Sequence, residues 1–184
     1  MDVDQERFFR DELFSLTLMA TVQRAGVYKA KVPEHSRRAF QATLRSKLEQ
    51  VARDYEHEVE EETHIQNIVE FSDSLTQRHK NILNGSRFRL GTAQKALNLY
   101  LKYLWCLGKI PRPPHCPFDF RIIAKLSTYK GPKWTDLDHE KDYRNLIAAA
   151  KSKAQGIPLA VWELQTYNNI QLRAGGDAPQ ATHR

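Results

Sequence analysis

The segment RLGTAQKALNLYLKYLWCLG, residues 89–108, constrains the fold more than any other part of the chain. Because it is strongly apolar, it predicts a helix from Thr92 to about Leu107 that packs in a core. Gly108 and the prolines of the following segment, PRPPHCPF, end this helix, since proline lacks the N–H that a continuing helix needs. The helix also holds two lysines, which are unusual in a core.

The remaining segments also follow helical rather than alternating patterns, so the predicted fold class is all-α. We expect helices over 5–24, 34–59, 62–83, 92–107, 119–126, from Asp136 or Asp138 to about 154, and 159–170. Their expected buried residues are Phe8, Leu13, Leu16, Met19 and Ala20, then Phe40, Leu44, Leu48 and Val51, then Ile65, Ile68, Val69, Phe71, Leu75 and Ile82. A single helical domain is expected over residues 1–172, followed by a disordered tail over 173–184.

Charge points to an anionic partner. The chain of 184 residues carries a formal net charge of +6, and its lysines and arginines are concentrated in residues 78–133, whereas residues 54–73 are acidic. Such a bias favours nucleic acid, because basic side chains neutralise phosphates and release counterions. A merely solubilising surface remains the alternative.

Several classes of protein are not expected. No run of about 18 apolar residues suggests a membrane span, and the acidic N-terminus lacks the pattern of a signal peptide. Two cysteines are too few for a disulfide framework, so a cytoplasmic location is predicted. Cys106, His115 and Cys116 lack the spacing of a closed metal site, and no phosphate-binding glycine motif is present, so neither a metal nor a cofactor is expected.

A turn lies directly before the apolar helix. The sequence NGSRFRLG, residues 84–91, joins two predicted helices, as in a helix-hairpin-helix arrangement. The free N–H groups at the start of the second helix could hold a phosphate, and Arg87 and Arg89 could add charged contacts. An ordinary connection between two helices is the alternative.

Lys95 and Lys102 are seven residues apart, which places both amines on one side of the helix. Partial burial and a like-charged neighbour lower the pKa of a lysine and make it a nucleophile able to attack a sugar C1′. Such a reaction needs a carboxylate, and Asp119 follows the proline-rich segment at the predicted start of a helix. The alternatives are two lysines with exposed amines and a simple helix N-cap at Asp119.

The order of hairpin, lysine helix and proline-preceded aspartate resembles the helix-hairpin-helix DNA glycosylases. KALNLYLKYLWCLG followed by PPHCPFDFRII is most similar to the archaeal 8-oxoguanine DNA glycosylase branch, and IPLAVWELQTYN is loosely similar to the helix that closes its base pocket. The matching positions are Lys95, Lys102, Pro117, Asp119 and Arg121. The resemblance covers residues 82–126 well and places the hairpin and catalytic segment at about 75–127.

The resemblance implies a glycosylase-like helical domain that flips a modified or damaged base out of double-stranded DNA. Lys95 would be the Schiff-base nucleophile, Asp119 the essential carboxylate and Lys102 a nearby support. The expected DNA contacts are Arg87, Arg89, Gly91, Thr92, Gln94 and Arg121. The expected base pocket comprises Trp105, Trp162, Tyr100, Tyr167 and His115.

Three functions follow from these observations. The first is a DNA glycosylase, with or without a β-lyase step. The second is a non-catalytic helical DNA-binding protein that uses the same hairpin and basic surface. The third is a helical interaction protein whose acidic segment, residues 54–73, meets a basic partner.

Overall fold

The computed structural model describes residues 2–175, and within them the chain is helical, with no β-strand and one isolated bridge. The predicted all-α class is confirmed. The α-helices are α1 (Val3–Ala20), α2 (Glu34–Ala52), α3 (Glu61–His79), α4 (Leu90–Cys106), α5 (Phe120–Ile123), α6 (Glu140–Ala154) and α7 (Leu159–Gly175). Short 3-10 turns cover Arg53–Glu56 and Asn84–Ser86.

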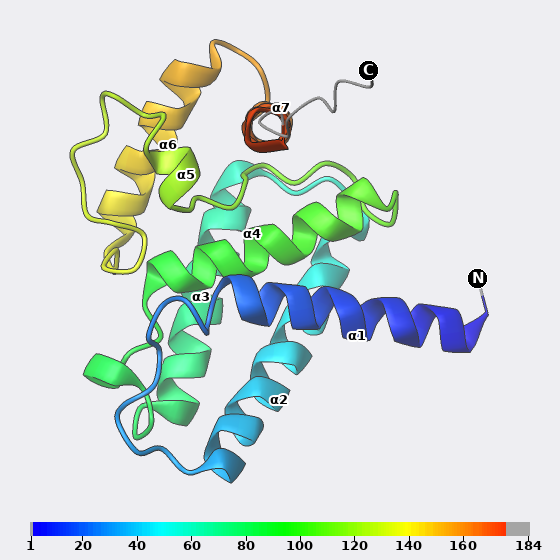
Figure 1. Cartoon of the computed structure of the whole chain (residues 1–184), viewed down its shortest axis with the longest axis vertical. Helices are drawn as coiled ribbons and strands as arrows, with labels where there is room; N and C mark the ends of the chain where they lie inside the picture. Colours follow the sequence, from blue (N-terminus) through cyan, green and yellow to red (C-terminus); the bar gives the residue numbers. More distant parts are fainter. Residues whose placement is uncertain (1, 176–184) are drawn as a thin grey trace, which may run out of the picture.

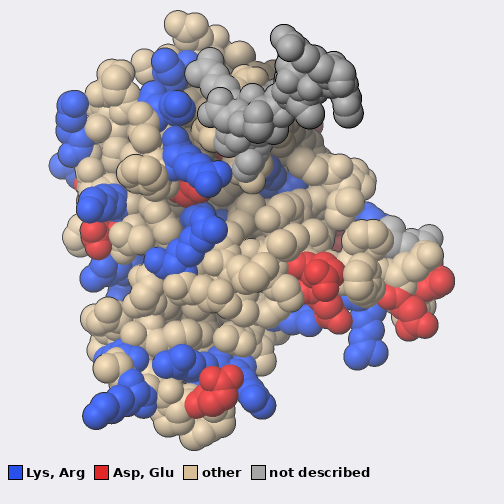
Figure 2. All heavy atoms as spheres, in the orientation of Figure 1, with Lys and Arg blue, Asp and Glu red and all other residues tan. Residues whose placement is uncertain are grey.

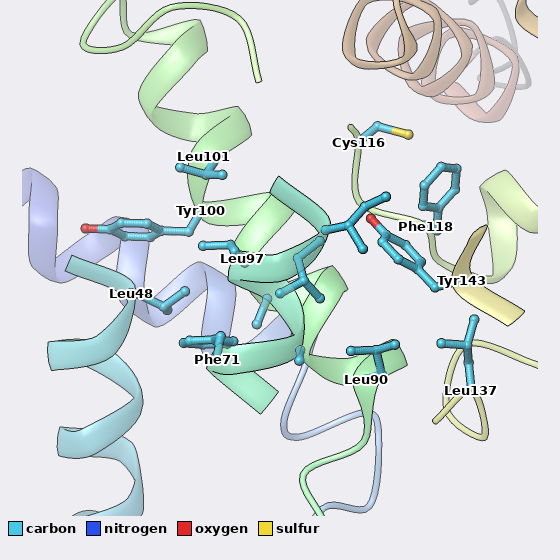
Figure 3. Packing of buried hydrophobic residues seen from close by; sticks show 14 of the residues in the cluster. Leu48, Phe71, Leu90, Leu97, Tyr100, Leu101, Cys116, Phe118, Leu137 and Tyr143 are labelled. Carbon is cyan, nitrogen blue, oxygen red and sulfur yellow. The ribbon is translucent and has the colours of Figure 1, made fainter. Parts of the chain in front are cut away.

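Helix α4 occupies the middle of the molecule. It crosses the view in Figure 1 with α2 below it and α5, α6 and α7 above it, and it packs against α1, α2, α3 and α6. Twelve of its seventeen residues are buried, which confirms the prediction of a core helix. Figure 3 shows Leu97 and Leu101 of α4 in the same cluster as Phe71 and Leu48 of the neighbouring helices.

The turn before α4 is built as the sequence indicates. Gly85 adopts a left-handed conformation with φ of +62°, which glycine accepts without strain. Gly91 serves a different purpose, because a Cβ at this position would lie 1.8 Å from the carbonyl oxygen of Trp134. The absence of a side chain therefore lets α4 approach the connection between α5 and α6 closely.

Helix α1 buries a different face from the one predicted. Leu13 is buried, but Phe8, Leu16 and Met19 are between 41% and 60% exposed. The buried face of α1 includes Thr17, whose hydroxyl donates to the carbonyl oxygen of Leu13 and so needs no outside partner. Thr17 can therefore be buried although it is polar, because its hydroxyl is hydrogen-bonded within its own helix.

Aspartate caps were predicted at the starts of α5 and α6. Asp119 is the N-cap of α5, as predicted, and accepts hydrogen bonds from the backbone N–H groups of Arg121 and Ile122. The prediction that Asp136 or Asp138 caps α6 is wrong, since the N-cap there is His139 without a side-chain hydrogen bond.

Other helix ends differ from the prediction by three to seven residues. Helix α2 ends at Ala52, where the chain tightens into a 3-10 turn, rather than continuing to residue 59. Helix α3 ends at His79, and α5 ends at Ile123. Helix α7 continues to Gly175, past the predicted domain boundary, and the rest of the expected tail, 176–184, lies outside the described residues. No helix between residues 2 and 175 is both long enough and apolar enough to cross a lipid bilayer.

Candidate functional site

A cleft of about 450 Å³ opens where the end of α1, the middle of α4, the start of α5 and α7 meet. Its volume lies within the range of about 300–1,000 Å³ that is typical of ligand sites. The charged residues that line it are Arg24, Lys95, Lys102, Asp119, Arg121 and Glu163. A second groove, of about 260 Å³, lies between α1 and the end of α4, but it is mainly apolar and offers no comparable set of reactive groups.

Lys95 is buried at the wall of this cleft, with 5% of its side chain exposed. Its Nζ donates a hydrogen bond of 2.8 Å to the carbonyl oxygen of Ala20 at the end of α1. The same nitrogen lies 4.3 Å from the centre of the Trp134 ring and 3.8 Å from Oδ2 of Asp119. The amine is thus enclosed by the end of α1, the segment that carries Trp134 and the N-cap of α5. It does not extend into solvent, which was the alternative.

The surroundings of Lys95 lower the pKa of its amine. Burial lowers the pKa of Lys95 below that of an ordinary lysine, and the charges of Arg24 and Arg121 lower it further. The carboxylate of Asp119 opposes this by raising the pKa of Lys95. The balance is a lowered pKa, which increases the fraction of nucleophilic amine at neutral pH.

Asp119 is an N-cap, which was one of the two alternatives, and its second carboxylate oxygen lies near Lys95. Its Oδ1 accepts hydrogen bonds of 2.9 and 3.1 Å from the backbone N–H groups of Arg121 and Ile122, which caps α5. Its Oδ2 faces Lys95. The cap holds the carboxylate in place, and one oxygen remains directed at the amine.

Lys102 forms an ion pair that the sequence did not predict. Its Nζ lies 2.7 and 3.0 Å from the two carboxylate oxygens of Glu163 on α7, and both side chains are buried. The Nζ of Lys102 also lies 4.6 Å from the centre of the Tyr167 ring. Burial raises the pKa of Glu163, and Lys102 partly offsets this effect. The signal in the sequence was a single acidic residue in the otherwise apolar start of α7, LAVWEL.

The arginines of the hairpin are occupied within the protein. Arg87 lies 2.6 Å from Asp73 and 3.0 Å from Asp138, and Arg89 lies 3.0 Å from Asp136. Both arginines were expected to contact DNA. Their charges are instead balanced by carboxylates, so they would have to leave these partners to contact a phosphate.

The start of α4 does not present a phosphate site, which corrects the expectation for Gly91, Thr92 and Gln94. All three residues are buried. The N–H of Gly91 donates to the carbonyl oxygen of Leu137, and the preceding N–H, of Leu90, donates to Asp138. These helix donors are therefore used inside the protein. Arg121, by contrast, lies at the cleft.

Of the five residues expected in the base pocket, only Tyr167 lines the cleft. Tyr100 is buried, and its ring points away from Tyr143, toward α1 and α2 (Figure 3). Trp105 is half-buried and Trp162 is buried, but neither lines the cleft. Trp134, which the sequence analysis did not single out, is the aromatic ring nearest to the amine of Lys95.

His115 belongs to a buried polar cluster behind the cleft. Its Nδ1 lies 2.9 Å from the hydroxyl of Tyr143, and its ring packs edge-on against His64 with 4.6 Å between centroids. On the other side, Nε2 lies 3.8 Å from Glu61. Burial lowers the pKa of both histidines, so they are neutral at pH 7.

Cys106 is exposed and Cys116 is buried, and neither forms a disulfide. Across residues 2–175, no three His, Cys, Asp or Glu side chains are grouped closely enough to hold a metal ion. The comparisons with family models, with curated proteins and with solved structures give no match.

Proposed function

We propose that this protein is a DNA glycosylase that excises a modified or damaged base with Lys95 as nucleophile and Asp119 as its carboxylate partner. The observation that carries the proposal is the buried amine of Lys95, 3.8 Å from Oδ2 of Asp119 at the wall of an open cleft. Its lowered pKa increases the fraction of the neutral form that attack on a carbon centre requires.

In the proposed reaction the amine attacks C1′ of an extruded nucleotide, and the C1′–N bond to the base breaks with its electron pair leaving on the base. The amine loses a proton and the base gains one. Opening of the sugar then moves the remaining amine proton to O4′ and gives an imine between Lys95 and C1′. Asp119 would stabilise positive charge on the sugar and accept the proton from the amine. A β-lyase step would remove a proton from C2′ and release the 3′ phosphate.

Charge around the cleft supports DNA as the substrate. Arg24 and Arg121 line the cleft, and the chain carries a net charge of +6. On the face drawn in Figure 2, Lys and Arg side chains gather over α5 and the end of α1, the elements that border the cleft. These cations would contact phosphates on either side of the extruded nucleotide, in place of the occupied arginines of the hairpin.

Borohydride trapping tests the reaction class. The protein is incubated with duplexes that each carry one modified base, and sodium borohydride reduces any imine to a stable protein–DNA adduct. We expect an adduct with at least one duplex, no adduct with Lys95→Gln, and an undiminished adduct with Lys153→Gln, an exposed lysine on α6. Excision without a trappable adduct would exclude Lys95 as an imine-forming nucleophile.

The alternative, a non-catalytic DNA-binding protein, gives a different result. It would bind duplex DNA with an affinity that falls steeply between about 50 and 200 mM salt, and it would excise none of the bases. Lys95→Gln would then change the affinity only slightly. Absence of salt-dependent binding would exclude both functions and favour a protein-interaction role.

A further inference from the structure

Gln94 connects the two residues of the proposed reaction. It directly precedes Lys95 in α4, and it contacts Phe118, which directly precedes Asp119. A single side chain thus joins the backbone beside the nucleophile to the backbone beside the carboxylate, across 24 residues of sequence.

The amide of Gln94 makes four hydrogen bonds in the interior. Its Nε2 donates to the carbonyl oxygens of Phe118, at 2.8 Å, and Gly91, at 2.9 Å. Its Oε1 accepts from the N–H of Phe118, at 3.2 Å, and from Nδ2 of Asn98, at 3.3 Å. Gln94 and Phe118 are both fully buried.

These contacts determine which way the amide faces. The oxygen must face the N–H of Phe118 and the nitrogen the carbonyls of Phe118 and Gly91, so the reversed orientation would lose these three hydrogen bonds. Gln94 is the hydrogen-bond partner of both backbone polar groups of Phe118. Its loss would leave them buried without a partner, at a cost of about 1–3 kcal/mol for each group. An apolar residue at position 94 could fill the space but could not hold this backbone.

The geometry points to Gln94 as a positioning residue that fixes Asp119 at its distance from Lys95. The inference rests on the proposed function for its meaning in catalysis, although the positioning itself is a property of the free protein. With Phe118 held at both polar groups and α5 capped by Oδ1 of Asp119, the segment before α5 is held at two adjacent residues. Oδ2 is left facing the amine.

The test uses the pKa of Lys95 as a measure of its coupling to Asp119. In protein that retains Gln94, Asp119→Asn is expected to lower the pKa of Lys95, because the carboxylate raises this pKa. The pKa is read from the pH dependence of the Lys95 ¹³Cε signal in protein labelled with ¹³C-lysine, assigned by its absence in Lys95→Gln. Arg24 and Arg121, which also face the amine, are retained in every variant.

The same Asp119→Asn change is then made with Gln94→Met, which keeps an unbranched side chain but removes the hydrogen bonds. We expect the shift produced by Asp119→Asn to fall to less than half of its value in the Gln94 protein. An equal shift with and without Gln94 would overturn the proposal. Gln94→Leu, which also removes the hydrogen bonds, provides a second background if the Met variant does not fold.

Ser72→Ala is the matched control. Ser72 is also fully buried, and its hydroxyl donates to the backbone carbonyl of Phe88, away from the cleft. Its loss should destabilise the protein without changing the effect of Asp119→Asn on the pKa of Lys95. If Ser72→Ala weakened this effect as much as Gln94→Met, the role of Gln94 would be general packing.

Once a substrate is known, Gln94→Met is expected to lower kcat by about 100-fold with KM changed by less than about two-fold, because misplacement of a reacting group affects the chemical step. The pKa measurement needs no DNA. Failure of the proposed function would appear as absent excision with the Lys95–Asp119 coupling intact. Failure of the positioning role would appear as a coupling that does not depend on Gln94.

Discussion

Asp119 divides its two carboxylate oxygens between structure and proposed chemistry. Oδ1 caps α5 and Oδ2 faces Lys95. The two roles need different properties, because capping requires only an acceptor oxygen, whereas stabilising positive charge requires a carboxylate. Substitution can therefore separate them.

We expect Asp119→Asn to retain the cap, since asparagine is also a strong N-cap residue, so its cost reports only the lost charge that faces Lys95. Asp119→Ala removes the cap as well and should cost about 1 kcal/mol more than Asp119→Asn. Both variants should lose base excision while retaining DNA affinity. Urea unfolding, a gel-shift titration and an excision assay measure the three quantities, and retained excision in Asp119→Asn would remove the carboxylate from the mechanism.

Among the helices, α4 provides the frame of the site. It carries Lys95, Lys102 and Gln94, and each makes a contact to a different part of the chain. The prediction placed this helix within two residues at its start and one at its end, because the glycine turn and the prolines mark both ends. What these side chains meet could not be predicted, since helical periodicity does not specify the neighbouring element.

Gly91→Ala tests the close approach at the start of α4. Helix propensity alone would favour alanine by about 1 kcal/mol. Here a Cβ would lie 1.8 Å from the carbonyl oxygen of Trp134, so we expect a net loss of about 1–3 kcal/mol from overpacking. Ser152→Ala, at an exposed position of α6, is the control and should be neutral or slightly stabilising in the same unfolding assay. A more stable Gly91→Ala protein would contradict the tight packing.

The Lys102–Glu163 pair joins α4 to α7, and a double-mutant cycle measures its strength. Each single change, Lys102→Met or Glu163→Leu, leaves a buried charge without its partner and should destabilise the protein by about 3–5 kcal/mol. The double variant should cost much less than the sum of the two. The exposed pair Glu34 and Arg38 on α2 is the control, with an expected coupling of about 0.3–0.5 kcal/mol. Additive losses at Lys102 and Glu163 would show that the pair does not hold α7.

Across the whole molecule, buried histidines link stability to pH. Burial lowers the pKa of His64 and His115, and the pKa of His79 is also lowered. The unfolded chain therefore binds more protons than the folded protein below about pH 6.5. The contribution of these histidines to the free energy of unfolding should be complete above that pH. It should fall as the pH decreases, by up to about 1.4 kcal/mol per pH unit for each proton.

Urea unfolding between pH 5 and pH 8 measures this slope. His64→Asn and His115→Asn should each make it shallower, while His35→Gln, at an exposed site on α2, should leave it unchanged. This range lies above the window of Glu61, whose contact with His115 and ion pair with Lys151 lower its pKa to about 2. The contribution of Glu61 is complete above about pH 4.5 and is lost as the pH falls toward 2. A flat profile between pH 5 and pH 7 would contradict the buried, neutral histidines.

Local sequence was sufficient to predict the helices and the cap at Asp119, but not the end of α2 or the cap of α6. It also placed Lys95 and Lys102 on one side of α4, because helical periodicity and the breaking effects of glycine and proline act over a few residues. The prediction failed where the answer depended on a distant partner. Glu163 pairs with Lys102 across 61 residues, and Arg87 pairs with Asp138 across 51.

The packing of the helices against one another accounts for the remaining differences. Thr17 rather than Met19 is buried on α1, and His115 is enclosed behind the cleft. Gln94, which was expected to contact DNA, is buried and hydrogen-bonded to the backbone of Phe118. An amphipathic pattern shows that a helix has a buried face, but several helices can cover that face. Which carboxylate meets which amine is therefore set by tertiary packing, through contacts between residues that are far apart in the chain.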